Sequence, residues 1–117
     1  MKHGLIKVAA AIPAVKVADT KFNLIETEKQ IAIAEGQGVE IIVFPELSIT
    51  GYTCQDLFQQ QLLLDDTEQA VIELLEFTRQ LDITVIVGAP VAVGALLLNC
   101  ALVIQQGKLL GIVAKTF

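Results

Sequence analysis

Short apolar runs, separated by stretches long enough for helices, constrain the fold of this 117-residue chain more than any other feature. Residues 40–44 (EIIVF) are almost continuously apolar, which is typical of a strand buried on both faces of a parallel sheet. Residues 5–12 (LIKVAAAI) form a similar run closed by Pro13, and residues 83–88 (ITVIVG) form another that ends before Pro90. The chain therefore contains at least three predicted strands.

Two segments between these strands have the periodicity of a helix. Small and apolar side chains recur at steps of three and four in the first segment: Leu24, Thr27, Ile31 and Ala34. We expect this helix over residues 19–38, with Asp19 or Asn23 capping its start and Gly36 or Gly38 ending it.

The second helix is expected over residues 66–81. The acidic side chains of Asp65, Asp66 and Glu68 stand at its predicted start and Arg79 near its end, which is the charge order that a helix dipole favours. This position accounts for the acidic cluster without a functional role.

The last two predicted strands cover residues 96–104 and 109–114, and Gln105, Gln106 and Gly107 between them predict a tight antiparallel turn. The order is then β-α-β-α-β-β-β. That order predicts an α/β fold with a mixed sheet and helices packed on one or both of its faces.

Composition excludes several classes of function. The net charge is −5 and no basic cluster occurs, so nucleic-acid binding is not expected. No apolar run reaches the ~20 residues that a membrane helix needs. The N-terminal stretch differs from a signal peptide because Lys7 and Lys16 interrupt its apolar run. The chain has two cysteines, which do not indicate a disulfide framework. We expect a cytoplasmic protein.

Glu46 and Lys115 are the candidate catalytic residues. Glu46 follows the strand at residues 40–44, and Lys115 follows the strand at residues 109–114. If these strands run parallel, both side chains emerge at one rim of the sheet, where ligands of α/β proteins gather. A carboxylate there can act as a general base, and an ammonium can support it and stabilise an oxyanion. Position alone also allows a solvated loop carboxylate and an exposed lysine.

The two cysteines and the tyrosine are the remaining candidates for site residues. Cys54 shares a polar loop with Glu46 and is a possible nucleophile, although a lone loop cysteine is common and no histidine is near it. Cys100 lies in an apolar strand and is expected to be a small core residue. Tyr52 either lines a pocket or packs. No phosphate loop and no cluster of metal ligands occurs, so no cofactor or metal is expected.

The segment FPELSITGY around Glu46 and the later segment AKTF around Lys115 resemble the nitrilase (carbon–nitrogen hydrolase) superfamily. Three longer segments are similar to one branch of it, the glutaminase domains of glutamine-dependent NAD synthetases: KVAAAIPAVKVADTKFN, PELSITGYTCQDLF and LLNCALVIQQGKLLGIVAKTF. The resemblance covers essentially the whole chain.

The resemblance implies a role for each matching residue. Glu46 matches the general base of a Glu-Lys-Cys triad, Lys115 matches the lysine that stabilises the tetrahedral intermediate, and Tyr52 matches a tyrosine near the bound glutamine amide. The nucleophilic cysteine of this family follows a later strand, beyond the last residue of this chain. Neither Cys54 nor Cys100 matches it.

The resemblance also implies a fold and an activity. Residues 1–117 would be an incomplete glutaminase domain, the first part of an α-β-β-α sandwich that is inactive by itself. The parent enzyme would release ammonia from glutamine for NAD synthesis in a second domain that uses ATP and Mg²⁺, whereas this fragment would hold no cofactor. Its expected partners are glutamine and the rest of the same polypeptide, and the full-length form is expected to be a homo-oligomer.

Two other functions remain open at this point. One is a free-standing nitrilase-type amidase that acts on a small amide, and the other is a non-catalytic interaction module. A second domain after this one would favour the synthetase. A non-catalytic module should be soluble and folded alone, whereas half of a sandwich should expose an apolar sheet face and associate.

Overall fold

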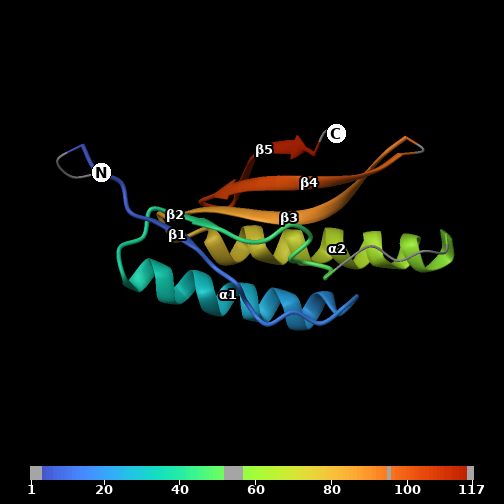
Figure 1. The fold of residues 1–117 in the computed structure, drawn as a ribbon, viewed down its shortest axis with the longest axis horizontal. Coiled ribbons are helices and arrows are strands. Elements are labelled where there is room, and N and C mark those ends of the chain that lie inside the picture. The colour runs from blue at the N-terminus through green and yellow to red at the C-terminus, as the bar shows by residue number, and fades with distance from the viewer. Residues whose placement is uncertain (1–3, 52–56, 95, 116–117) are drawn as a thin grey trace.

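The computed structural model describes residues 4–51, 57–94 and 96–115, which form one mixed sheet and two helices (Figure 1). The elements in chain order are β1 (Val8–Ala10), α1 (Thr20–Gly36), β2 (Ile41–Val43), α2 (Leu57–Thr78), β3 (Thr84–Val93), β4 (Leu96–Gln105) and β5 (Lys108–Ala114). In the sheet the strands stand in the same order as in the chain. β1, β2 and β3 are parallel neighbours, whereas β4 and β5 join as antiparallel neighbours. The predicted α/β class and mixed sheet are confirmed.

Both helices lie on one face of the sheet and pack against each other, as Figure 1 shows. Alternate strand residues point toward them and form the core. Val85 pairs with Ile104 and Val87 with Leu102, and all four side chains are buried. Ile31 and Leu74 cover this layer from the helices and are fully buried. The result is a two-layer core in which apolar burial supplies the main stabilisation.

The opposite face of the sheet is apolar and has no helix over it among the described residues. It carries the other set of strand side chains, such as Val8, Val43 and Val113, whose exposed fractions are 61%, 40% and 61%. Val43 pairs with Ile86, and Val113 pairs with Ala101, so one continuous surface crosses all five strands. We call this surface the open face.

Helix α2 begins at Leu57, so the predicted start at residue 66 is wrong. Leu63, before that point, is already buried and begins a series at helical steps that continues through Thr67, Ala70 and Leu74. Asp65 and its acidic neighbours consequently lie inside the helix, and the dipole argument for their placement fails. The residues before 66 are rich in leucine and glutamine, both good helix formers, and this propensity was missed.

Strand β3 runs through Pro90 instead of ending before it. The even-numbered residues of this strand turn their backbone groups toward β2 and the loop after it, since Phe44 N–H donates to Ile86 O and Ile49 N–H donates to Gly88 O. By the same alternation the nitrogen of Pro90 points away from β4 and toward the β2 side of the strand. At the level of Pro90, β2 has already ended. The missing N–H therefore breaks no bond of the β3–β4 ladder.

The hairpin between β4 and β5 has the predicted tight turn. Gln106 and Gly107 both have positive φ, 49° and 78°. This pair of left-handed residues is the backbone of a two-residue hairpin turn, and Gly107 adopts it without steric cost. Because β5 returns antiparallel to β4, it runs in the same direction as β2 and β3. The carboxyl ends of β2 and β5 therefore reach the same rim of the sheet.

No helix in the described ranges 4–51, 57–94 and 96–115 is long and apolar enough to cross a membrane.

Candidate active site

The loop that follows β2 carries Glu46 and lies directly on strand β3. Gly88 of β3 makes this approach possible, because a Cβ on it would collide with Leu47 N and lie 2.8 Å from Pro45 O. The carbonyl of Gly88 also accepts the Ile49 N–H at 3.2 Å. Because Gly88 has no side chain, the backbone of the Glu46 loop can pack directly against β3.

Asn23 of helix α1 braces the same loop from the other side. Its side chain is 1% exposed. Nδ2 donates to Ile49 O and to Lys16 O, both at 2.8 Å, and Oδ1 accepts the Lys16 N–H at 2.7 Å. Asn23 therefore holds the Glu46 loop and the segment before α1 together, and we call it a clamp. It does not cap the helix, which was one of the two possibilities expected from the sequence. Asp19 is the cap, and it accepts the Phe22 N–H at 3.0 Å.

Lys115 reaches Glu46 from the end of β5. Its Nζ lies 3.1 Å from Oε2 and 3.3 Å from Oε1 of Glu46, across 69 residues of sequence. The exposed fractions of the two side chains are 47% for Lys115 and 52% for Glu46. An ion pair this exposed adds little to stability, so the fold does not depend on it. The expectation that both side chains emerge at one rim is confirmed.

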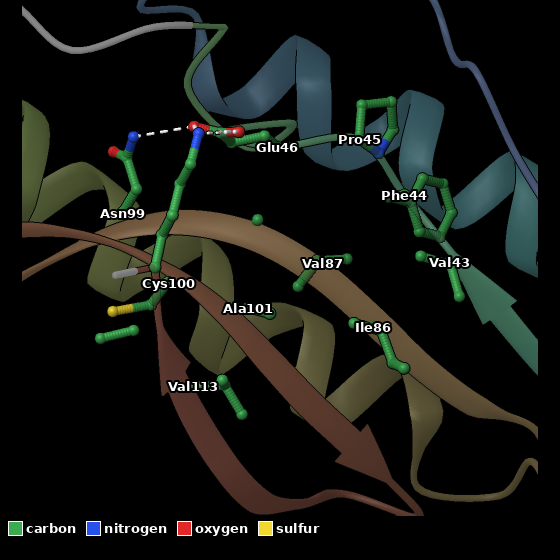
Figure 2. A pocket seen from close by; sticks show the side chains of 13 residues that line it. Val43, Phe44, Pro45, Glu46, Ile86, Val87, Asn99, Cys100, Ala101 and Val113 are labelled. Atoms are coloured by element: carbon green, nitrogen blue, oxygen red, sulfur yellow. Dashed lines mark hydrogen bonds and ion pairs between the residues drawn. The ribbon is translucent and has the colours of Figure 1, made fainter. Parts of the chain in front are cut away.

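Asn99 is a third polar residue at this rim, and it was not predicted from the sequence. It lies in β4, and its Nδ2 donates to Glu46 Oε1 at 2.9 Å, as Figure 2 shows. Its backbone carbonyl accepts the Lys115 N–H at 2.8 Å, so Asn99 contacts both members of the ion pair. A signal was present, since Asn99 is the one polar side chain in the apolar stretch LLLNCALVI.

A pocket of about 310 Å³ opens beside these three residues on the open face. Its floor is apolar and is formed by Val43, Ile86, Ala101 and Val113 (Figure 2). Glu46, Asn99 and Lys115 are the polar groups of its lining. An apolar cavity with a few convergent polar groups is the usual form of a small-molecule site. The carboxylate can accept a proton there, and the ammonium can stabilise a developing oxyanion.

Of Tyr52 and the two cysteines, only Cys100 lies among the described residues. Tyr52 and Cys54 fall in the gap between the described ranges, so their predicted roles lie outside the described residues. Cys100 is buried in β4, and burial raises the pKa of its thiol. A buried thiol held protonated is a poor nucleophile, and Cys100 is the core residue that was expected.

Among the described residues, no group of three or more His, Cys, Asp or Glu side chains could hold a metal ion.

A family profile, a sequence relative and two solved structures all match this chain and agree with one another. The profile of the carbon-nitrogen hydrolase family matches residues 7–116. The glutamine-dependent NAD(+) synthetase of Mycobacterium tuberculosis strain H37Rv is 32% identical over 116 residues, which are 99% of this chain and 17% of that protein. The chain thus spans less than a fifth of the length of this relative.

Two solved structures are similar along almost the whole chain. The glutamine-dependent NAD(+) synthetase from Cytophaga hutchinsonii superposes with a TM-score of 0.86 and 30% identity, covering 96% of this chain and 19% of that one. The synthetase from Acinetobacter baumannii, solved with adenosine diphosphate, gives 0.85 and 28%, covering 96% and 21%. The fold class predicted from the sequence is the one that these proteins have.

Proposed function

The chain belongs to the carbon–nitrogen hydrolase family, and from this premise we propose that it is part of a glutaminase domain that releases ammonia from glutamine for NAD synthesis. One observation carries the proposal: the ion pair of Glu46 and Lys115, brought together across 69 residues at the polar end of an apolar pocket. The names of the relatives support glutamine as the substrate and NAD synthesis as the use of the ammonia.

Glu46 and Lys115 have separate tasks in the proposed reaction. A thiol attacks the carboxamide carbon and passes its proton to Glu46. Negative charge develops on the carboxamide oxygen, and the Lys115 ammonium stabilises it. Glu46 then gives the proton to the departing nitrogen, ammonia leaves, and water hydrolyses the thioester with Glu46 again accepting a proton. Tyr52 is proposed to contact the bound glutamine amide.

The thiol of this reaction is proposed to come from a cysteine that follows a later strand, so residues 1–117 would be the first part of the catalytic domain. The relative from M. tuberculosis supports this, because the match covers 17% of its length. Reading the coding region past Phe117 tests the proposal. A cysteine after a strand and then a nucleotide-binding domain are expected, and a stop codon directly after Phe117 would contradict it.

ATP and Mg²⁺ are proposed to act in that further domain. The synthetase solved with adenosine diphosphate supports the use of an adenine nucleotide by such proteins. Within residues 4–51, 57–94 and 96–115, no group of three or more His, Cys, Asp or Glu side chains fits a metal ion. We further propose a cytoplasmic location and a homo-oligomeric full-length protein, the latter testable by light scattering.

Ammonia release is the direct test of the function. The protein encoded by the whole reading frame should hydrolyse glutamine much faster than short aliphatic amides, whereas the 117-residue chain alone should not hydrolyse it. A preference for aliphatic amides would favour a free-standing amidase. Absence of any amide hydrolysis by the whole protein would contradict the proposal and favour an interaction module.

A further inference from the structure

The two carboxylate oxygens of Glu46 accept different numbers of hydrogen bonds. Oε1 accepts from two donors, Asn99 Nδ2 at 2.9 Å and Lys115 Nζ at 3.3 Å. Oε2 accepts from Lys115 Nζ at 3.1 Å, and no second donor to it lies among the described residues. A carboxylate oxygen offers two lone-pair sites, so Oε1 has both occupied and Oε2 has one left.

We propose that Asn99 is a positioning residue that makes Oε2 of Glu46 the oxygen that accepts and returns the proton. This inference rests on the proposed function and deepens it. In the first step the S–H bond of the attacking thiol breaks, a C–S bond forms, and the proton goes to Oε2. In the second step the oxyanion re-forms the carbonyl, the C–N bond breaks, and the proton goes from Oε2 to the amide nitrogen, which leaves as ammonia. Asn99 stays bonded to Oε1 throughout.

The chemistry of the Asn99 carboxamide supports its role in orienting the Glu46 carboxylate. Asn99 must present its NH₂ group to Glu46, since the opposite orientation would place two oxygens against each other. A neutral donor fixes the carboxylate without adding a second positive charge beside Lys115. The carbonyl of Asn99 also accepts the Lys115 N–H, so one residue sets the spacing between base and ammonium.

A purely structural role explains these contacts less well. Asn99 is only partly buried, so water could satisfy its side chain and the fold does not require the bond to Glu46. Asn23 is the opposite case, because it is 1% exposed and makes three bonds to backbone groups. Removing Asn99 should therefore affect the reaction more than the stability.

Steady-state kinetics of the protein encoded by the whole reading frame test the proposal. Asn99→Ala should lower kcat for glutamine hydrolysis about 10- to 100-fold and leave KM within about twofold, because the lost bond aligns the base and does not hold the substrate. Asn99→Asp keeps the shape of the side chain but cannot donate when ionised, and should lower kcat at least as much. Gln105→Ala is the matched control, since its carboxamide lies at the other end of β4 and donates to Asp82 O.

Crystal structures of the variants give a readout that does not need activity. In Asn99→Ala the Glu46 carboxylate should rotate away from the orientation in which Oε1 faces residue 99, while the backbone stays in place. An unchanged kcat in an active protein, or a Glu46 carboxylate that keeps its orientation in Asn99→Ala, overturns the inference. If the wild-type protein does not hydrolyse glutamine, the proposed function fails, and the orientation of Glu46 in the variant still decides the role of Asn99.

Discussion

At the scale of single residues, the site consists of a carboxylate whose partners come from distant parts of the chain. Lys115 and Asn99 lie 69 and 53 positions from Glu46 along the sequence, yet both contact its side chain. Each partner is delivered by a strand of the same sheet. The distance between the two charges of the candidate site is therefore set by strand register and not by local sequence.

Replacing Glu46 removes the proposed base. Glu46→Gln keeps the size of the side chain and loses the proton acceptor, so glutamine hydrolysis should fall by about 10²- to 10⁴-fold. The measurement is ammonia release by the whole encoded protein. Glu76→Gln is the control, because Glu76 is a surface carboxylate of α2 that pairs with Arg79 just after the helix. Near-normal hydrolysis by Glu46→Gln would remove the catalytic assignment.

Lys115→Ala removes the charge that is proposed to stabilise the oxyanion. The expected loss is about 10²- to 10³-fold in kcat, the range seen when one preorganised donor is removed from an oxyanion site. Lys108→Ala provides the matched control, since Lys108 begins the same strand at its other end. Equal effects of the two substitutions would mean that Lys115 acts through general charge and has no specific role.

Gly88→Ala should move Glu46 without touching it. The added Cβ would lie 2.8 Å from Pro45 O and 3.0 Å from the Glu46 carbonyl carbon, so the loop must shift away from β3. We expect lower kcat and lower stability together. Gly111→Ala is a matched control in β5, where an added Cβ meets nothing within 4 Å. Full activity and stability of Gly88→Ala would contradict the close approach described above.

At the scale of elements, the site depends on how one loop is held between a helix and a strand. The loop after β2 is clamped by Asn23 of α1 and by Gly88 of β3. Helix α1 was expected from its period, but the buried role of Asn23 was not, since an asparagine near a helix start is more often a cap. Burial distinguishes the two roles, and burial is a property of the packed elements.

Asn23→Ala should destabilise the protein more than removal of the true cap. The substitution leaves the buried Ile49 carbonyl and the part-buried backbone groups of Lys16 without these partners, which we expect to cost about 2–3 kcal/mol in the free energy of unfolding. Asp19→Ala should cost about 1 kcal/mol, the typical value of a lost N-cap. Urea unfolding of both variants measures the difference. The reverse order would show that Asn23 is not the main clamp.

At the scale of the whole molecule, one face of the sheet is covered by helices and the other is apolar and open. Half of a layered sandwich has this form, because apolar surface on both faces of a sheet needs a second layer. The candidate pocket lies on the open face, so any layer that packs there would also enclose the substrate. Stability and catalysis would then depend on the same contact.

The 117-residue chain by itself should self-associate through the open face. Val113→Asp should reduce association measured by sedimentation, because Val113 is 61% exposed on that face. Ile33→Asp is the control on the outer side of α1, where the exposed fraction is a similar 55%. A monomeric, cooperatively folded chain would instead favour a non-catalytic module.

The order of elements, the α/β class and the candidates Glu46 and Lys115 could be predicted from the amino-acid sequence, because these depend on local apolar periods and short motifs. The prediction placed the start of α2 nine positions late and ended β3 before Pro90, since both errors concern residues whose state is decided by neighbours in space. Asn99, Gly88 and the clamp of Asn23 emerged only in the tertiary structure. Their roles rest on contacts between residues far apart in the chain, and a hydrogen bond or a close approach exists only when packing brings the partners together.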